Sequence, residues 1–461
     1  MSAAIEAILE AAGGANVHAR SGTVVRVSGE IVAVAGVNFR PNELAFVEGT
    51  GGQMLPAQCA GSGGREANLA LLERGTVAIG ARVHASGRLP AVPVGRSLLG
   101  RVVDGLGRPM DGGAEFRWAR RVTAQAEPPH PLDRQPITSA LASGVRAVDG
   151  FLTLGRGQRV GIFAGSGVGK STLLGMLARG TAADVTVIAL IGERGREVRD
   201  FIEHDLGVEA LQHCVIVAST GDNPAAMRLC AANSATAIAE ALRDEGLDVL
   251  LLFDSLTRVA MAQREVGLAA GEPPTTRGYP PSVFSLLPHL MERAGPAATG
   301  SITAIYTVLV DGDDMDEPIA DISRATLDGH IVLKRSLASA GHYPPIDVLA
   351  SVSRLMSRVA APEHRAAAEE LRGLLAAYED SRDLINIGAY VRGADGVTDR
   401  AIDLLPRING FLRQRADDNV AFGTAVTGLL ELAGAGGAAI DEGGVIDGTY
   451  ADAFEAADEA S

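Results

Sequence analysis

Cysteine is scarce in this sequence. The 461 residues include three cysteines, Cys59, Cys214 and Cys230, and none shows the spacing of a metal site or of a CxxC redox pair. Cys214 and Cys230 lie in apolar stretches, which predicts buried and inert thiols. An odd number of cysteines without a disulfide framework is typical of a reducing cytosol. The cysteine content therefore argues against a disulfide-stabilised secreted domain.

Basic charge and long apolar runs are also lacking. Lys and Arg number 41 against 56 Asp and Glu, so the net charge is −15. A general nucleic-acid binder needs clustered Lys and Arg, and the composition argues against that class while leaving room for a small basic patch. The segment MSAAIEAILEAAGG carries acids where a signal peptide needs basic residues, and no run approaches the ~20 apolar residues of a membrane span. We therefore expect a cytosolic protein, which a membrane complex can still hold at its surface.

Short segments of strand character fill the chain from about residue 15 to residue 95. The candidate strands are GTVVRVSG (22–29), EIVAVAGV (30–37), ELAFVEG (43–49) and GTVAIGARVHASG (75–87). Turn residues separate them, and short strands at even spacing predict a small sandwich or barrel. We assign a β-barrel domain to residues 1–95.

Buried strands alternate with helices in the middle of the chain, after a Pro-rich connector at 127–137. The candidate strands are RVGIFA (159–164), VTVIALI (185–191), CVIVAS (214–219), DVLLLFD (248–254), SITAIYTVL (301–309) and HIVLK (330–334). Continuous apolar runs suit parallel strands covered on both faces, so we predict a doubly wound α/β domain over residues 96–360. One helix is well marked: Asp222 or Asn223 can cap it, Pro224 takes its first turn, and Gly246 follows its end.

The last part of the chain is helical in pattern. The segment APEHRAAAEELRGLLAAYEDSRDLI (361–385) has apolar residues at helical spacing, and we assign a helical domain to residues 361–433. Residues 434–461 contain acidic residues and no basic one among glycines and alanines. This composition predicts a disordered tail.

The stretch AGSGVGKST (164–172) nearly satisfies the phosphate-loop pattern G-x-x-x-x-G-K-[ST], with Ala164 in place of the first glycine. An apolar strand precedes it and a helix follows, which is the context that the pattern requires. Ala164 is tolerated if its φ is negative, since only a positive φ demands glycine. We expect backbone N–H groups and the helix N-terminus to bind phosphates, Lys170 to reach the β- and γ-phosphates, and Ser171 to ligate Mg²⁺. The expected nucleotide-binding residues of the loop are Gly165, Ser166, Gly167, Val168, Gly169, Lys170, Ser171 and Thr172.

Two carboxylates follow buried strands, at the edge where open α/β sheets bind ligands. Asp254 ends one strand and can organise Mg²⁺, or alternatively cap the helix that begins at Ser255. Glu193 directly follows another strand and can orient the attacking water, or alternatively form a loop salt bridge with Arg194 or Arg196.

Long motifs in a fixed order resemble the type III secretion ATPases and their flagellar export relatives. The motifs are LLGRVVDGLGRPMDG (98–112), SGVRAVDGFLTLGRGQRVGIFAGSGVGKSTLLGMLAR (143–179), GERGREV (192–198), the segment from LLLFDSLTR to MERAG (250–295), DGDDMDEPIAD (311–321), LDGHIVL (327–333) and HYPPIDVLASVSR (342–354). The resemblance runs from about residue 20 to residue 415. Both groups are similar to the catalytic subunit of rotary ATP synthases. AQREVGLA (262–269) favours the injectisome branch over the flagellar one.

The resemblance implies a RecA-like α/β core between a small barrel and a helical domain, and a homohexamer that uses ATP and Mg²⁺. It implies that Lys170, Glu193 and the arginine finger Arg354 are catalytic, that Ser171 and Asp254 hold the metal, and that Tyr343 packs against adenine. Pro345 stands where the family usually has Ala, which can shift the adenine pocket. The implied partners are stalk and stator proteins, chaperone–effector complexes and the inner-membrane export gate, with no nucleic acid.

Other functional classes fit the sequence less well. An RNA translocase of the same core type needs a barrel with stacking aromatics and basic residues, whereas the N-terminal region offers Phe39 and Phe46. A non-catalytic nucleotide-binding subunit lacks the water-activating glutamate, which is present here as Glu193. A synthase-type rotary subunit is disfavoured by the export-like Gly-Glu-Pro-Pro segment at 271–274. We therefore expect a Mg²⁺-dependent ATPase that energises protein export by releasing chaperones and unfolding substrates, peripheral at the inner membrane.

Overall fold

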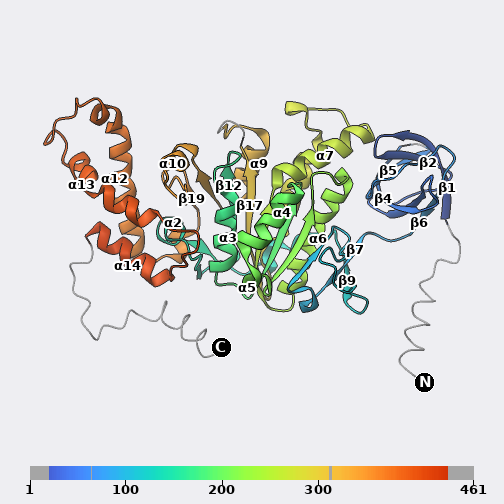
Figure 1. Cartoon of the computed structure of the whole chain (residues 1–461), viewed down its shortest axis with the longest axis horizontal. Helices are drawn as coiled ribbons and strands as arrows, with labels where there is room; N and C mark the ends of the chain where they lie inside the picture. The colour runs from blue at the N-terminus through green and yellow to red at the C-terminus, as the bar shows by residue number, and fades with distance from the viewer. Residues whose placement is uncertain (1–19, 64, 311–313, 435–461) are drawn as a thin grey trace, which may run out of the picture. The chain divides into compact units, whose positions relative to one another are not determined.

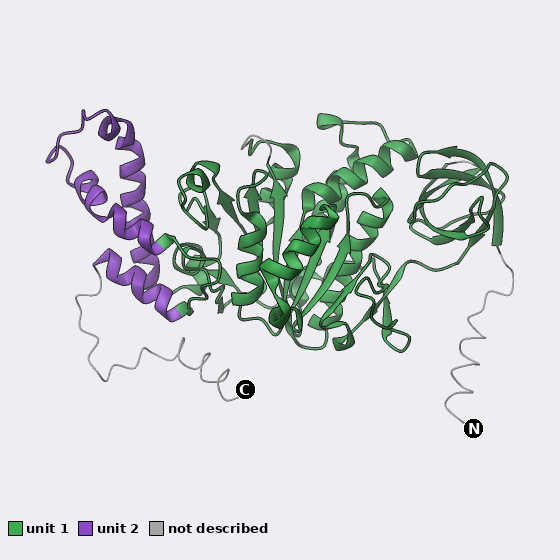
Figure 2. Cartoon of the chain, viewed as in Figure 1, with its two compact units in different colours: residues 1–360, 412–422 green, residues 361–411, 423–461 purple. Residues whose placement is uncertain are grey.

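The computed structural model describes residues 20–63, 65–310 and 314–434. The chain divides into two compact units, Met1–Ala360 with Leu412–Phe422 and Ala361–Phe411 with Gly423–Ser461 (Figure 2). The acidic segment expected to be disordered lies, from residue 435 on, outside the described residues, as does the N-terminal segment up to residue 19.

A closed six-stranded β-barrel begins the first unit (Figure 1), with strand order β1-β2-β5-β4-β3-β6. The strands are β1 (Arg20–Ser28), β2 (Ile31–Ala35), β3 (Leu44–Glu48), β4 (Met54–Gly63), β5 (Glu66–Leu71) and β6 (Arg82–Ala85). Residues alternate between the interior and solvent, as in β3, where Ala45 and Val47 are buried while Phe46 and Glu48 are exposed. The expected barrel is confirmed, and β4 and β5 are strands that the sequence pattern did not indicate.

The centre of the first unit is a nine-stranded sheet, in the order β19-β18-β12-β17-β15-β13-β14-β8, with the short β16 paired to β17. Its strands are β8 (Arg101–Val103), β12 (Arg159–Ala164), β13 (Val185–Ile191), β14 (Cys214–Ser219), β15 (Asp248–Asp254), β16 (Gly295–Pro296), β17 (Ser301–Leu309), β18 (Gly329–Leu333) and β19 (Val352–Ser353). All neighbours from β18 to β8 are parallel, whereas β19 and β16 pair antiparallel. Two small antiparallel pairs complete the strands, β7 (Ala91–Val94) with β9 (Arg120–Thr123) and β10 (Ala140–Leu141) with β11 (Leu154–Gly155).

Helices connect these strands and cover the sheet. They are α2 (Arg146–Phe151), α3 (Lys170–Gly180), α4 (Gly195–Asp200), α5 (Val208–Leu211), α6 (Ala225–Arg243), α7 (Leu256–Ala270), α8 (Pro281–Glu292), α9 (Pro318–Thr326), α10 (Arg335–Ser339) and α11 (Met356–Val359). All residues of β13 are buried, and Val187, Ala189 and Ile191 pack in one cluster with Ile238 of α6 and Val259 of α7. The doubly wound α/β domain is thus confirmed, and its six predicted strands form within one residue of their expected ends.

The start of α6 differs from the expected cap. Its N-cap residue is Pro224, and neither Asp222 nor Asn223 caps the helix through its side chain. The Ala225 N–H donates instead to Oε2 of Glu30, which precedes β2 in the barrel, at 3.2 Å. Gly246 follows the helix with a φ of 91°, as expected.

The second unit is helical, with α12 (Pro362–Asn386), α13 (Gly396–Leu412) and α14 (Phe422–Ala433). The helix predicted at 361–385 is confirmed as α12. Within the described ranges, no helix is both long and apolar enough to cross a bilayer. The three cysteines are free and buried, and burial raises the pKa of Cys214 and of Cys230 to about 12, so these thiols are unreactive at neutral pH.

Candidate functional site

The stretch 164–172 comprises the last residue of β12, a loop over residues 165–169 and the first turn of α3. Ala164 is the last residue of β12, is buried, and is not among the described residues with positive φ. The positive φ values of the loop fall on Gly167 (75°) and Gly169 (106°), which is the N-cap of α3. The substitution at the first glycine position therefore costs no backbone strain, because the turn is made by glycines that are present.

A cavity of about 380 Å³ lies beside this loop. The lining residues are Gly165, Ser166, Gly167, Gly169, Lys170, Ser171, Thr172, Glu193, Arg194, Glu197, Arg258 and Leu309. Of the loop residues expected to bind nucleotide, Val168 does not line the cavity, and its side chain is buried. Because α3 begins at Lys170, its unpaired N–H groups and the positive end of its dipole face this space, which suits an anion such as a polyphosphate.

Lys170 joins the two carboxylates that the sequence singled out. Its Nζ lies 2.5 Å from Oδ1 of Asp254 and 3.3 Å from Oε1 of Glu193. Burial lowers the pKa of Lys170, but the negative charges of Asp254 and Glu193 more than offset this and raise it. The ammonium group is thus fully charged at neutral pH.

The alternative roles of the two carboxylates are wrong. Ser255, rather than Asp254, caps α7, its Oγ accepting from the Arg258 N–H at 3.4 Å. Arg194 pairs with Glu197 and Arg196 pairs with Asp200, so the salt bridge of Glu193 is the one to Lys170.

Asp254 is held from a second side by β17. Thr307 Oγ1 donates to Oδ1 of Asp254 at 2.7 Å, and both side chains are buried. The Lys170 contact also falls on Oδ1, and within the described residues Oδ2 accepts no hydrogen bond. Ser171 is exposed in the first turn of α3. A hydroxyl and one carboxylate oxygen at a phosphate-binding loop fit Mg²⁺, which keeps most of its ligands as water and substrate phosphate.

Tyr343 lies at the same loop. Its side chain is 51% exposed, and its Cε1 is 3.8 Å from the position that a Cβ on Gly169 would take. Pro345 Cδ lies equally close, so the segment after α10 packs on the end of the loop. The Tyr343 ring therefore lies beside the phosphate loop, and the adenine contact that the motifs imply for it stays a prediction.

Arg354 is not brought to this cavity. It follows the edge strand β19, is exposed, and its Nη2 donates to the carbonyl of Arg324 at 3.1 Å. Within one subunit, then, Arg354 is separate from Lys170 and Glu193.

Besides Glu197 and Leu309, which line the cavity, sequence reasoning missed four residues near the loop. Arg194 and Arg258 line the cavity, and the Arg258 Nε is buried and makes no hydrogen bond in the described part of the chain. Arg335 donates from Nη2 to the carbonyl of Ser166 at 2.9 Å, and Thr307 binds Asp254. Arg194 stands next to Glu193 in the sequence, which was a usable signal, whereas the other three reach the site only through the tertiary fold.

Comparison with known proteins identifies the family. The profile of the ATP synthase alpha/beta family, nucleotide-binding domain, matches residues 144–353, and that of the T3SS EscN ATPase C-terminal domain matches residues 360–431. The chain is 50% identical over 422 residues to the flagellum-specific ATP synthase of Bacillus subtilis (strain 168), covering 90% of this chain and 96% of that protein. It is 51% identical over 407 residues to the type 3 secretion system ATPase of Xanthomonas euvesicatoria, covering 87% and 92%.

A solved structure has the same fold. The assembled ATPase EscN in complex with its central stalk EscO, from the enteropathogenic E. coli type III secretion system, superposes with a TM-score of 0.82 at 44% identity, covering 89% of this chain and all of that one. The resemblance seen in the motifs is therefore confirmed. The chain belongs to the family of the type 3 secretion system ATPases and the flagellum-specific ATP synthases.

Proposed function

We propose that this chain hydrolyses ATP with Mg²⁺, as a ring of six identical subunits, to energise type 3 protein export. The observation that carries the proposal is Lys170 at a phosphate-binding loop, in contact with Asp254, the last residue of β15, and with Glu193, two residues after the neighbouring strand β13. Family membership supports the reaction class.

The residues divide the chemistry among them. The loop N–H groups and Lys170 bind the β- and γ-phosphates, so Lys170 exchanges its contacts with Glu193 and Asp254 for contacts with phosphate. Glu193 is then free to orient the water that attacks the γ-phosphorus. Ser171 Oγ and Asp254 hold Mg²⁺, which supplies neutralisation of the phosphate charge. Arg194 and Arg258 line the same cavity and add positive charge beside the transferring group.

Arg354 completes the site of the neighbouring subunit. It is exposed beyond an edge strand and does not line the cavity of its own chain, which is the arrangement expected of a finger supplied in trans. Tyr343 packs against adenine. Such a shared site fits a ring, in which each copy supplies its arginine to the next.

The ring works with other components of the export apparatus. The EscN relative forms a complex with a central stalk, and a stalk, stator proteins, chaperone–effector complexes and the export gate are the partners proposed here. The ATPase sits in the cytoplasm, peripheral to the inner membrane, and drives chaperone release and substrate unfolding. We favour the injectisome on the AQREVGLA segment; relatives of both branches match at similar identity.

Substitution within the site tests the reaction. Glu193→Gln and Lys170→Ala abolish ATP turnover while the melting temperature shows an intact fold. Glu203→Gln is the control, because Glu203 is a carboxylate of the neighbouring segment that pairs with Arg199 and does not line the cavity. Substantial hydrolysis by the Glu193 or Lys170 variant, or equal loss in the control, contradicts the assignment.

Mixed rings test the arginine finger. Arg354→Ala binds nucleotide but hydrolyses it poorly, and mixing it with Lys170→Ala restores part of the activity, because the Lys170 variant donates its finger to the intact loop of the other. No recovery in verified mixed hexamers contradicts a finger in trans.

Deletion of the gene in its host decides between the branches. Loss of effector secretion with normal motility supports the injectisome, and loss of motility with normal effector secretion supports the flagellum.

A further inference from the structure

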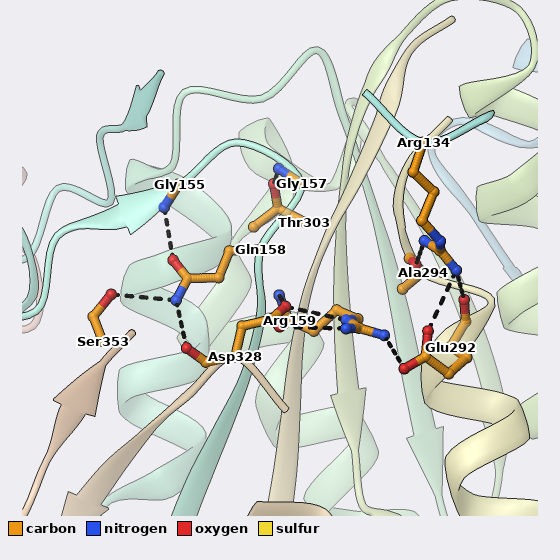
Figure 3. A network of polar contacts seen from close by, with 10 residues as sticks. All are labelled: Arg134, Gly155, Gly157, Gln158, Arg159, Glu292, Ala294, Thr303, Asp328 and Ser353. Atoms are coloured by element: carbon orange, nitrogen blue, oxygen red, sulfur yellow. Dashed lines mark hydrogen bonds and ion pairs between the residues drawn. The ribbon is translucent and has the colours of Figure 1, made fainter. Parts of the chain in front are cut away.

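Gln158 directly precedes β12, at the opposite end of this strand from the phosphate loop, and its side chain is fully buried. All of its polar side-chain atoms have partners (Figure 3). Its Oε1 accepts from the Gly155 N–H at 2.7 Å, and its Nε2 lies 3.2 Å from both the carbonyl of Asp328 and the Oγ of Ser353. A buried amide with this many contacts fixes the positions of the groups around it.

These contacts converge on the backbone that carries Arg354. Ser353 is the residue before Arg354, and its hydroxyl also donates to the carbonyl of Thr153 at 2.9 Å. The Arg354 N–H donates to the same Asp328 carbonyl that Gln158 binds, at 3.0 Å. Gln158 thus binds the hydroxyl of the residue before the arginine and the carbonyl that accepts from the arginine's own N–H.

The rest of the attachment consists of a short strand pairing and two further hydrogen bonds: Arg354 Nη2 donates to the Arg324 carbonyl at 3.1 Å, and Ser351 Oγ accepts from the Val332 N–H at 2.9 Å. Strand β19 has two residues, and it pairs with β18 at Gly329↔Ser353 and His330↔Val352. The backbones are very close there, since a Cβ on Gly329 would lie 2.6 Å from the Val352 carbonyl oxygen. With so short a ladder, side-chain contacts must do much of the positioning.

An ion-pair network fixes Asp328 in turn. Its Oδ2 accepts from Nε and the backbone N–H of Arg159, both at 3.1 Å, and Arg159 also pairs with Glu292 at 2.6 Å (Figure 3). Although burial opposes it, hydrogen bonding to Asp328 raises the pKa of Arg159. The Asp328 carbonyl that Gln158 and Arg354 share is therefore rigidly placed.

We propose that Gln158 is a positioning residue for Arg354: it aims the arginine of one subunit at the nucleotide of the next. The inference rests on the proposed function, in which Arg354 acts in trans. The proposal names which site is affected. Although β12 leads from Gln158 to the phosphate loop of the same subunit, a change at Gln158 affects hydrolysis at the site of the neighbouring subunit, which Arg354 enters.

Mixed hexamers separate these two directions. In rings of Arg354→Ala and Lys170→Ala subunits, the active interfaces pair the loop of the first with the arginine of the second. Gln158→Met, which keeps the length but removes the amide, is added either to the Lys170→Ala subunit, which donates the arginine, or to the Arg354→Ala subunit, which donates the loop. The second placement is the control for folding and for any effect of Gln158 through β12.

Gln158→Met in the arginine donor lowers the recovered kcat by roughly ten- to a hundredfold, since a displacement of ~1 Å in a catalytic group costs on the order of 10²-fold. In the loop donor it leaves the recovered kcat and the KM for ATP close to those of the parent mixture. Equal losses in both placements, or a loss in the loop donor alone, overturn the inference. If the parent mixture itself shows no recovery, the proposed trans function fails, and the inference falls with it.

Discussion

Thr307→Val replaces one hydroxyl by a methyl group of similar size at the centre of the site. Thr307 is fully buried on β17, the strand between β12 and β15, and its Oγ1 donates to Oδ1 of Asp254 at 2.7 Å. A hydrogen bond to a charged group contributes about 1.5–3 kcal/mol, and about 1.4 kcal/mol corresponds to a factor of ten. We expect the Mg²⁺ concentration for half-maximal ATPase activity to rise by roughly ten- to a hundredfold, because Asp254 then loses the hydrogen bond that still holds it after Lys170 has exchanged its contact for phosphate. Nucleotide affinity without Mg²⁺ stays close to that of the wild type, because Thr307 does not line the cavity.

Thr303→Val is the matched control. Thr303 lies on the same strand and is buried, but its Oγ1 accepts from the Gly157 N–H at 2.7 Å, away from the phosphate loop. Loss of this bond lowers the free energy of unfolding by about 1–3 kcal/mol without changing the Mg²⁺ dependence. Titration of activity with Mg²⁺ for both variants decides the matter: an unchanged half-maximal concentration in Thr307→Val, or the same change in Thr303→Val, refutes the reasoning.

Three further changes test other parts of the structure. Tyr343→Ala weakens ATP binding by about 2–12-fold, the equivalent of ~0.5–1.5 kcal/mol of aromatic stacking, while calorimetry shows inorganic triphosphate binding unchanged; equal weakening of both would mean that the ring supports the loop instead. Arg293 is fully buried and binds the Glu240 carboxylate at 2.6 Å, so Arg293→Met leaves a buried charge without its partner and lowers the free energy of unfolding, measured in urea, by ~3–5 kcal/mol. The double variant with Glu240→Leu recovers most of this loss. No recovery would show that other contacts of Arg293 dominate. Hydrogen bonds from Arg101 lower the pKa of Asp111 in the folded state, so the Asp111 carboxylate stabilises the fold above its unfolded pKa and ceases to do so as the pH falls through its folded pKa. The difference in free energy of unfolding between the wild type and Asp111→Asn is therefore constant from about pH 7 to 5 and becomes smaller below about pH 4. A difference that grows in acid would contradict this.

The local parts of the architecture could be read from the sequence. The buried parallel strands are continuous apolar runs, so their ends were predictable almost to the residue. Barrel strand β4 was missed because Pro56 and two glycines interrupt the alternation that marks a half-buried strand. Strand β5 was missed because its sequence, EANLAL, contains none of the β-branched or aromatic residues that are typical of strands. In the central sheet the apolar sequence of each strand indicates that the strand is buried, whereas the sequences of β4 and β5 contain no such signal.

The site also has parts that the sequence predicts and parts that it does not. The phosphate loop is contiguous, and Asp254 and Glu193 follow strands whose ends must meet at one edge of the sheet, so their proximity to Lys170 could be expected. Thr307 lies inside an apolar strand, and its role depends on the order β12-β17-β15, which the sequence does not state. The capping of α6 was beyond reach for the same reason, since Glu30 precedes its helix by 195 residues.

That distant cap limits how freely the barrel can be exchanged. Pro224 has no side-chain oxygen to offer α6, so the first turn of this helix takes its acceptor from the barrel, and Asn68 Nδ2 donates to the Ala270 carbonyl at the end of α7. The loop before α6 in turn carries Gly221, whose N–H binds the carbonyl of Glu193 at 2.9 Å. If the barrel is replaced by that of another protein, the helices α6 and α7 keep or lose these hydrogen bonds according to the residues of the new barrel. The barrel and the α/β domain are distinct folds, but an exchange of the barrel has to keep Glu30 and Asn68 if both helices are to keep these partners.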